Sequence, residues 1–189
     1  MILWTIQPEK IYDQILQTGR YHCDFQKSFM PDWKYQYDWL VSEMKSRIGE
    51  PPEGVTYPVW AWYMREGKRK KPDLRRERWG NGKKGDRFVR IEIDISENRL
   101  LLSDFDLWSI ILLNGLISMS EVEDRRLEVE YDRLSEEGKR EFRELNWQRA
   151  FDITPFENDW ISKGSCIQAT FWELHREDIR DVRHFTSAL

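Results

Sequence analysis

Cysteine is scarce in this chain: its 189 residues include only Cys23 and Cys166, which lie far apart. Two cysteines at this separation form neither the disulfide framework of a small secreted protein nor the spacing of a zinc site. Histidine is equally sparse, and His22, His175 and His184 show no ligand spacing. We therefore expect a reduced, cytoplasmic protein that has no metal site and whose histidines are surface or packing residues.

Long apolar runs are absent as well. The amino terminus lacks the basic region and apolar stretch of an export signal, and the most apolar helical segment, Phe105 to Leu113, is too short to cross a bilayer. There is no phosphate-binding glycine loop, zinc motif or serine-nucleophile elbow. These absences predict a protein without a membrane contact and exclude several common enzyme classes.

Aromatic and charged residues, by contrast, are abundant. Ten Trp and nine Phe provide bulky side chains for a core, and 34% of the residues are charged and suit a solvated surface. A chain of this length is large enough to bury a core of its own. We expect one domain over residues 1–189, without internal repeats.

Charge is distributed unevenly along the chain. Residues 65–87 contain eleven Lys and Arg against four Asp and Glu, although the whole chain has a net charge of -4. The glycines around Asn81 predict a flexible turn or loop in the second half of this segment. Such a basic segment binds the phosphates of a nucleic acid or a dinucleotide, or is simply a solvated surface. The candidate nucleic-acid ligands are Lys70, Lys71, Arg76 and Trp79, and Arg75, after Pro72-Asp73, is a candidate cofactor ligand.

Sequence periodicity predicts strands and helices in alternation. A strand over residues 3–7 precedes a helix that Pro8 opens and Gly19 ends. Asp32 is predicted to cap the next helix, which Gly49 stops. Further strands are predicted over 55–64, 88–95 and 100–102, and the second of these alternates cleanly between apolar and polar residues.

The second half of the chain is predicted to be richer in helix. Ser103 or Asp104 caps a helix that ends near Gly115, and two charged helices form a peripheral segment over 118–150. The remaining predicted elements are a closing strand at 166–174, a short turn or helix at 178–182 and a tail at 183–189. This succession of elements predicts an α+β fold.

Two of the predicted strands carry candidate site residues. On the closing strand, one face is apolar up to Glu173, and the other face carries Gln168. Glu173 is either a site carboxylate held against the ring of a ligand or a glutamate that reaches solvent at the strand end. On the strand over 55–64, Trp60 and Trp62 either stack against a planar base or nicotinamide or pack in the core.

Four segments together resemble a bacterial and phage family known only as a domain of unknown function. The segments are LWTIQPEKIYDQILQTGRY, PVWAWY, LLLSDFDLW and IQATFWELHREDIRDVRHF. This resemblance covers most of the chain and implies no activity.

Residues 3–21 also resemble, more weakly, the opening of ADP-ribosyltransferase-like folds, which include DarT-type nucleic-acid modifiers and RNA 2′-phosphotransferases. Those folds open with a strand that has a polar residue near its end and a helix that ends in glycine. Many close with a strand bearing the catalytic glutamate, here Glu173, and a short segment like 177–182. The resemblance implies a single α+β domain with a small split antiparallel or mixed sheet and surrounding helices.

The same resemblance implies a chemistry. Breaking the bond between nicotinamide and ribose develops positive charge on the sugar, which a carboxylate stabilises. Glu173 would be that carboxylate, and Gln7 or Thr5 would be the polar group of the first strand. The residues that would hold NAD are Tyr21, Trp60, Trp62, Tyr63, Arg75 and Gln168. The protein would then modify nucleic acid or protein, as a toxin or a component of phage conflict.

The chain departs from that family at two places. Thr5-Ile6-Gln7 stands where the first strand usually has His or Arg, and Gln168 does not complete a paired-glutamate motif. The alternative is therefore a non-catalytic module that binds nucleic acid through residues 65–87 or a protein partner through its aromatic strand.

Overall fold

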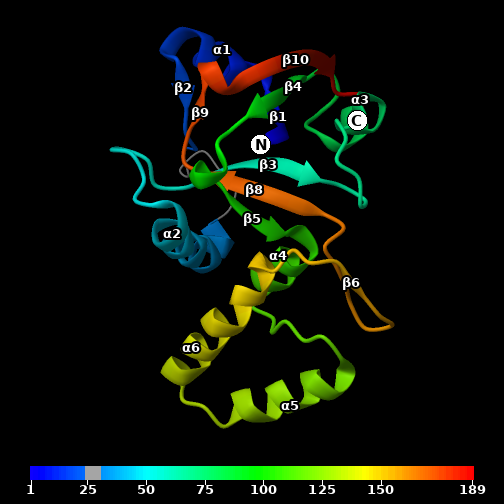
Figure 1. The fold of residues 1–189 in the computed structure, drawn as a ribbon. Coiled ribbons are helices and arrows are strands. Elements are labelled where there is room, and N and C mark those ends of the chain that lie inside the picture. The colour runs from blue at the N-terminus through cyan, green and yellow to red at the C-terminus, as the bar shows by residue number, and fades with distance from the viewer. Residues whose placement is uncertain (24–30) are drawn as a thin grey trace.

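A six-stranded antiparallel sheet is the centre of the fold. The structure, a computed structural model, describes residues 1–23 and 31–189. The strands of the sheet follow the order β10-β4-β1-β3-β8-β5 (Figure 1). They are β1 (Ile2–Pro8), β3 (Val59–Met64), β4 (Arg87–Asp94), β5 (Leu101–Asp104), β8 (Ile167–Phe171) and β10 (Ile179–Thr186). The chain is thus an α+β protein, as the sequence predicts, and every neighbouring pair in this sheet is antiparallel.

Helices and short strands surround this sheet. The α-helices are α1 (Glu9–Thr18), α2 (Lys34–Ile48), α3 (Leu74–Gly80), α4 (Phe105–Leu112), α5 (Glu121–Asp132) and α6 (Glu136–Trp147). Short 3-10 helices are η2 (Pro31–Trp33), η3 (Glu97–Arg99), η4 (Gln148–Phe151) and η5 (Arg176–Asp178). Two small antiparallel pairs join β2 (Arg20–Tyr21) to β9 (Leu174–His175) and β6 (Phe156–Glu157) to β7 (Ser162–Lys163). None of the helices in the described residues is long and apolar enough to cross a membrane.

The sheet is loosely joined at its middle. Strand β1 pairs with β4 along its whole length, from Ile2 to Pro8, but its register with β3 consists of the pair Trp4 and Trp62. Beyond that pair, the Thr5 hydroxyl donates a 2.9 Å hydrogen bond to the Trp60 carbonyl. A side chain therefore takes the place of ladder bonds, and the sheet divides into a β10-β4-β1 half and a β3-β8-β5 half.

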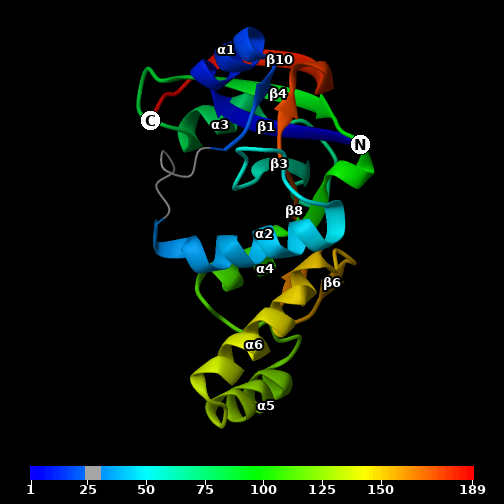
Figure 2. The same cartoon turned by 90° about the vertical axis from the view of Figure 1, so that its left-hand side faces the viewer.

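The two faces of the sheet bury different kinds of side chain. Helix α1 covers a mainly aliphatic core, which includes the inward residues that the alternating pattern predicts: Val89, Ile91 and Ile93 on β4 and Ile95 directly after it. Helices α2 and α4 cover the second core, which contains Trp39, Trp108, Trp147 and Trp172. Figure 2 shows α1 and α2 on opposite sides of the sheet, with α5 and α6 farther away beyond α2. Trp108, on α4, is among the buried residues of this second core.

Several predicted local features are confirmed. Gly19 ends α1 in the left-handed conformation, with φ of 82°, which glycine adopts without strain. Asp104, rather than Ser103, caps α4 by accepting hydrogen bonds from the backbone N–H groups of Asp106 and Leu107. In the two charged helices α5 and α6, the capping residues are Ser120 and Ser135.

The carboxyl-terminal segment is the main correction. Residues 178–182, predicted as a turn or helix, and the predicted tail at 183–189 instead contain β10, which pairs with β4 from Ile179 to Thr186. β10 is an edge strand with many polar, partly exposed side chains. Because one side of such a strand faces water, it lacks the clean apolar alternation by which strands are recognised.

Other boundaries also differ from the prediction. The Asp32 side chain does not cap α2, because a 3-10 turn intervenes and Trp33 occupies the capping position. The strand predicted from Val55 begins at Val59, directly after Pro58, which has no N–H group for a ladder. The basic segment contains α3, where no helix was predicted. β8 ends at Phe171, so Glu173 does not continue the apolar row of that strand.

Candidate functional site

A cleft of ≈ 420 Å³ opens where β1 separates from β3. Five residues predicted to act at the site line it together: Thr5, Gln7, Trp60, Trp62 and Gln168. Residues with no predicted role complete its wall, namely Ile6, Ala61, Arg65, Glu77, Gly80 and Asn81. The structure therefore gathers the first strand, the aromatic strand and the closing strand around one cavity.

Polar groups of the cleft differ in how far their hydrogen bonds are satisfied. The Gln7 side-chain amide donates to the Thr5 hydroxyl over 2.9 Å, so these two residues hold each other at the open end of β1. Gln168 is only 6% exposed, yet its Nε2 atom has no hydrogen-bond partner among the described residues. Ser103 lies opposite Gln168 in the β5–β8 register, and its side-chain oxygen likewise has no hydrogen-bond partner among the described residues. Buried groups of this kind gain free energy when a partner reaches them.

Aromatic rings form one wall of the cleft. The centroids of Trp62 and Phe105 lie 5.0 Å apart, and the Arg65 guanidinium lies 4.9 Å from the centre of a Trp62 ring. Trp60 packs against Trp108 with a centroid distance of 5.3 Å. Both Trp60 and Trp62 remain half-buried, so they combine packing with access to the cavity. The two interpretations of this strand, core packing and a ligand wall, are therefore compatible.

Behind Trp60, Tyr37 contributes a second aromatic layer. The rings of Tyr37 and Trp60 meet edge to face, with centroids 6.2 Å apart. Burial raises the pKa of the Tyr37 phenol to about 12, so this group is protonated at neutral pH.

Two other predicted NAD ligands lie outside the cleft. The Tyr63 ring packs against the aliphatic core and lies 4.1 Å from the Arg69 guanidinium. Tyr21, on β2, also packs against the aliphatic core. Neither side chain lines the cavity beside Trp60 and Trp62.

A smaller pocket of ≈ 140 Å³ lies beside the cleft and shares Arg65 and Glu77 with it. The cations Lys70, Lys71 and Arg76, predicted to bind nucleic acid, line this pocket together with Glu66, Pro72 and Asp73. Nearby carboxylates compensate these cations: Lys71 lies 2.9 Å from Glu92, and Arg76 lies 3.1 Å from Glu66. The pocket is therefore cationic in composition but contains its own counter-charges.

The remaining predicted residues of the basic segment are surface groups. Arg75 is 91% exposed, and its guanidinium lies 2.7 Å from Asp73. Hydrogen bonds from Arg75 hold the pKa of Asp73 at about 2. Trp79 is exposed and lines neither the cleft nor the smaller pocket.

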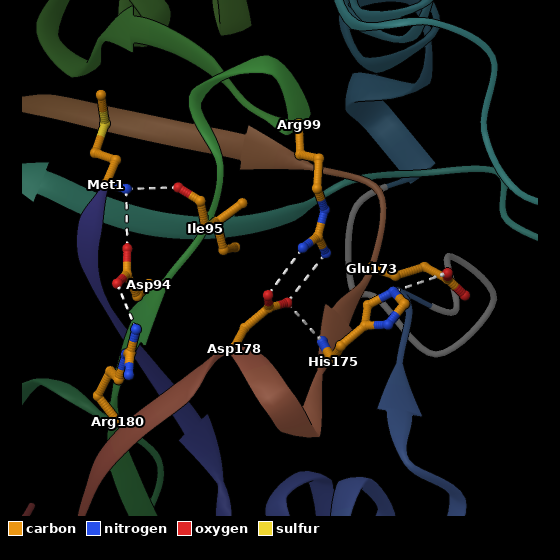
Figure 3. Close-up of polar contacts among 8 residues, drawn as sticks. All are labelled: Met1, Asp94, Ile95, Arg99, Glu173, His175, Asp178 and Arg180. Carbon is orange, nitrogen blue, oxygen red and sulfur yellow. Dashed lines mark hydrogen bonds and ion pairs between the residues drawn. The ribbon is translucent and has the colours of Figure 1, made fainter.

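Glu173 occupies a separate, buried position just after β8. Its carboxylate is 5% exposed, and Arg20 Nη1 lies 3.2 Å from Oε1. On the other side, His175 Nε2 lies 3.3 Å from Oε2 (Figure 3). Pairing of β2 with β9 places Arg20 opposite His175. Glu173 is absent from the lining of the cleft. Strands β1 and β8 are both antiparallel to β3. Their carboxyl-terminal ends, near Gln7 and Glu173, therefore lie at the same end of the sheet.

Sequence reasoning missed the partners of Glu173. His175 was predicted to be a surface or packing residue, and Arg20 was assigned no role. The sequence offers a weak signal, because Arg20 and His175 both lie in segments that resemble the family known only as a domain of unknown function. Their meeting depends on the pairing of β2 with β9, which joins residues far apart in sequence.

Comparison with protein-family models identifies the family of the chain. A family model described as "Domain of unknown function (DUF3841)" matches residues 2–180. None of the curated proteins matches the chain significantly. The matched range includes the cleft, the cationic pocket and the Glu173 cluster.

Proposed function

We propose that this chain, which belongs to the DUF3841 family of domains of unknown function, is an ADP-ribosyltransferase-like protein. Its donor substrate would be NAD, and its acceptor would be a nucleic acid or a protein. The observation that carries the proposal is the continuity between the aromatic cleft and the cationic pocket, which share Arg65 and Glu77. A cavity of this kind fits a planar ring joined to phosphates, which is the chemistry of a dinucleotide.

The cleft supplies groups suited to the ring and the ribose. Trp60 and Trp62 offer aromatic surface to a planar ring. The unpartnered Gln168 amide favours a ligand that carries a hydrogen-bonding group, and a small rotation of that side chain would present it to the cavity. Gln7, held by Thr5, is the polar group of the first strand and would bind a ribose hydroxyl.

The cationic pocket would receive the phosphates. Arg65 borders both cavities, and Lys70, Lys71 and Arg76 lie beyond it. Phosphate binding requires these side chains to exchange carboxylate partners for phosphate oxygens. The exchange is easiest for Lys70 and Arg76, because their ion pairs with Glu66 are solvent-exposed and each is worth about 1 kcal/mol or less.

Glu173 would supply the catalytic charge. In the reaction, the bond between ribose C1′ and the nicotinamide nitrogen breaks, and its electron pair leaves with nicotinamide. An oxygen or nitrogen of the acceptor forms the new bond to C1′ and releases its proton. A carboxylate facing the sugar stabilises the positive charge that develops as the bond breaks. The direction of the strands favours Glu173 for this role. Because β1 and β8 run the same way, Glu173 lies at the end of the sheet where Gln7 borders the cleft.

A second candidate function is non-catalytic binding of nucleic acid. Two observations favour it: Glu173 does not line the cleft, and the Arg20 guanidinium already opposes its charge. In that function the cleft stacks a base, while Lys70, Lys71 and Arg76 contact the backbone. Affinity should then fall steeply with added salt, because displaced counterions drive such binding.

One experiment separates the two functions. The pure protein is incubated with NAD labelled in its adenylate part, with mixed nucleic acids and proteins as acceptors, and nicotinamide release and label transfer are both measured. Transfer supports the transferase, and its complete absence together with salt-sensitive nucleic-acid binding supports the second function. Hydrolysis without transfer would show that NAD is cleaved but that water is the acceptor.

The Glu173→Gln variant tests the catalytic assignment. It preserves the size of the side chain but removes its charge, so NAD binding should survive while turnover falls by roughly two orders of magnitude or more. Glu141→Gln, which changes an exposed carboxylate of α6, is the matched control and should leave turnover unchanged. Full turnover by Glu173→Gln would disprove the assignment, and no NAD binding by the wild-type protein would disprove the enzyme function.

A further inference from the structure

The Glu173 carboxylate stands at the end of a chain of polar contacts that begins at Arg99. The Arg99 guanidinium binds Asp178 in a bidentate manner, with Nη1 2.8 Å from Oδ1 and Nη2 3.0 Å from Oδ2. Asp178 is only 6% exposed, whereas the Arg99 side chain is 39% exposed, so the ion pair joins a buried carboxylate to a cation at the surface. Figure 3 shows the contacts continuing from Asp178 through His175 to Glu173.

His175 and Asp178 bind each other reciprocally. The His175 backbone N–H donates to Asp178 Oδ2 over 3.1 Å, and the His175 side chain accepts a hydrogen bond from the Asp178 backbone N–H. A backbone N–H always donates, so the ring nitrogen that faces it must be the unprotonated one. The other ring nitrogen, Nε2, faces Glu173 Oε2 at 3.3 Å. In a neutral imidazole that nitrogen then carries the hydrogen.

We infer that His175 is a positioning residue for Glu173, held in the Nε2–H tautomer by the backbone of Asp178 and kept in place by the Arg99–Asp178 ion pair. This role deepens the proposed transferase function and rests on it for its catalytic meaning. His175 orients one carboxylate oxygen by a hydrogen bond. Because the donor is neutral, Glu173 keeps its negative charge for the sugar.

The charged groups around His175 favour this arrangement. A second proton on the imidazole would have to sit on the nitrogen that faces the Asp178 backbone N–H, where two donors would meet. Asp178 itself is already neutralised by Arg99, and Glu173 is approached by Arg20. Arg20 is 55% exposed and His175 is 32% exposed, so His175 is the less solvent-exposed of the two partners of Glu173 and the one that we expect to fix its direction.

The tautomer can be measured on the wild-type protein without any assay of activity. Nuclear magnetic resonance of protein labelled with 15N-histidine distinguishes protonated from unprotonated ring nitrogens. At neutral pH we expect His175 Nε2 to be protonated and its other ring nitrogen to be unprotonated. The Nε2 signal should shift in Glu173→Gln and remain in place in Glu141→Gln. A His175 ring protonated at both nitrogens, or only at the nitrogen facing Asp178, would overturn the inference.

Two substitutions at His175 test the positioning role in turnover. His175→Gln carries an amide N–H group to about the place of Nε2, whereas His175→Asn is shorter and reaches only the place of the other nitrogen. His175→Asn loses a hydrogen bond to a charged group. We therefore expect its kcat to fall roughly tenfold to hundredfold, with the KM for NAD nearly unchanged. His175→Gln should recover most of that loss.

The control is His184→Asn, at an exposed histidine of β10 that lies 2.8 Å from Glu9 and, among the described residues, forms no ion pair or hydrogen bond with Glu173 or Asp178; it should leave kcat unchanged. Equal turnover in His175→Asn, His175→Gln and the wild type would overturn the positioning role. Should the wild-type protein show no turnover of NAD, the proposed function fails, but the 15N measurement still decides whether His175 holds Glu173 in the stated tautomer.

Discussion

The ion pairs within residues 65–87 differ from those around Glu173 in burial and in the sequence separation of their partners. In residues 65–87, many ion pairs join exposed side chains that are close in sequence, such as Arg75 with Asp73. Glu173 is a single buried carboxylate, and its partners Arg20 and His175 come from a different pair of strands. The first region is conspicuous in the sequence, whereas the second becomes visible only in the folded chain.

The difference teaches that charge density along a sequence is a poor guide to a site. An exposed ion pair is screened by water and costs side-chain freedom, so it contributes about 1 kcal/mol or less. A buried charge that loses its partner costs several times more. Substitution of a surface charge therefore changes the free energy of unfolding little. A buried carboxylate, by contrast, is tolerated only where the fold supplies partners for it.

The sharpest test of this contrast is Asp178→Ala. The change leaves the Arg99 guanidinium without its bidentate partner and removes the acceptor of the His175 backbone N–H. Because Asp178 is buried, we expect the free energy of unfolding to fall by about 2–4 kcal/mol, measured by urea denaturation. Asp178→Asn keeps an acceptor oxygen and should lose less. A loss below about 0.5 kcal/mol in the alanine variant would contradict the contrast.

An intermediate case is Glu123, a partly buried carboxylate on α5. A hydrogen bond from Arg149, 2.8 Å away, and another from the Met119 backbone N–H lower its pKa from 4.5 to about 2. A pKa lowered by folding means that the charged form stabilises the folded state, fully above pH 4.5, and that this stabilisation is lost as pH falls toward 2.

The corresponding variant is Glu123→Gln. At pH 7 we expect its free energy of unfolding to be lower than that of the wild type by on the order of 1–2 kcal/mol, after allowance for solvent screening. The difference should shrink as the pH is lowered from 4.5 toward 2. Denaturation curves at several pH values measure it, and a difference that does not depend on pH would show that the charge of Glu123 is not responsible.

The smallest effect is expected at Arg75. Although the Arg75–Asp73 pair holds the pKa of Asp73 at about 2, both groups lie at the surface. Arg75→Ala should leave the free energy of unfolding essentially unchanged, because water screens the pair. A thermal unfolding curve clearly displaced from that of the wild type would show that the exposed pair has a structural role and would weaken the comparison with Asp178.

Elements with a strong local pattern could be predicted from the sequence. The alternation of Val89, Ile91, Ile93 and Ile95 identifies β4, and Gly19 marks the end of α1. Elements that are defined by pairing with a distant strand could not be predicted in this way. β10 is a polar edge strand whose identity depends on pairing with β4, far away in sequence.

The candidate site divides in the same way. Residues with recognisable chemistry on predicted strands, such as Trp62, Gln7 and Gln168, were identified and do line one cleft. Arg65 and Glu77 were not assigned to the cleft, because nothing in a run of charges shows which members border a cavity. The link between His175 and Glu173 was missed because it depends on a capping arrangement at η5 that also involves Asp178.

The strand order of the sheet bears on how the chain is made on the ribosome. β4 pairs with β1 on one side and with β10 on the other, and β10 is the last strand of the sheet to be synthesised. Until residues 179–186 emerge, the outer edge of β4 therefore has unpaired backbone N–H and C=O groups, and half of the sheet is incomplete. Such an edge is a template for pairing with another chain. The nascent protein therefore carries an open sheet edge until β10 has been made and pairs with β4.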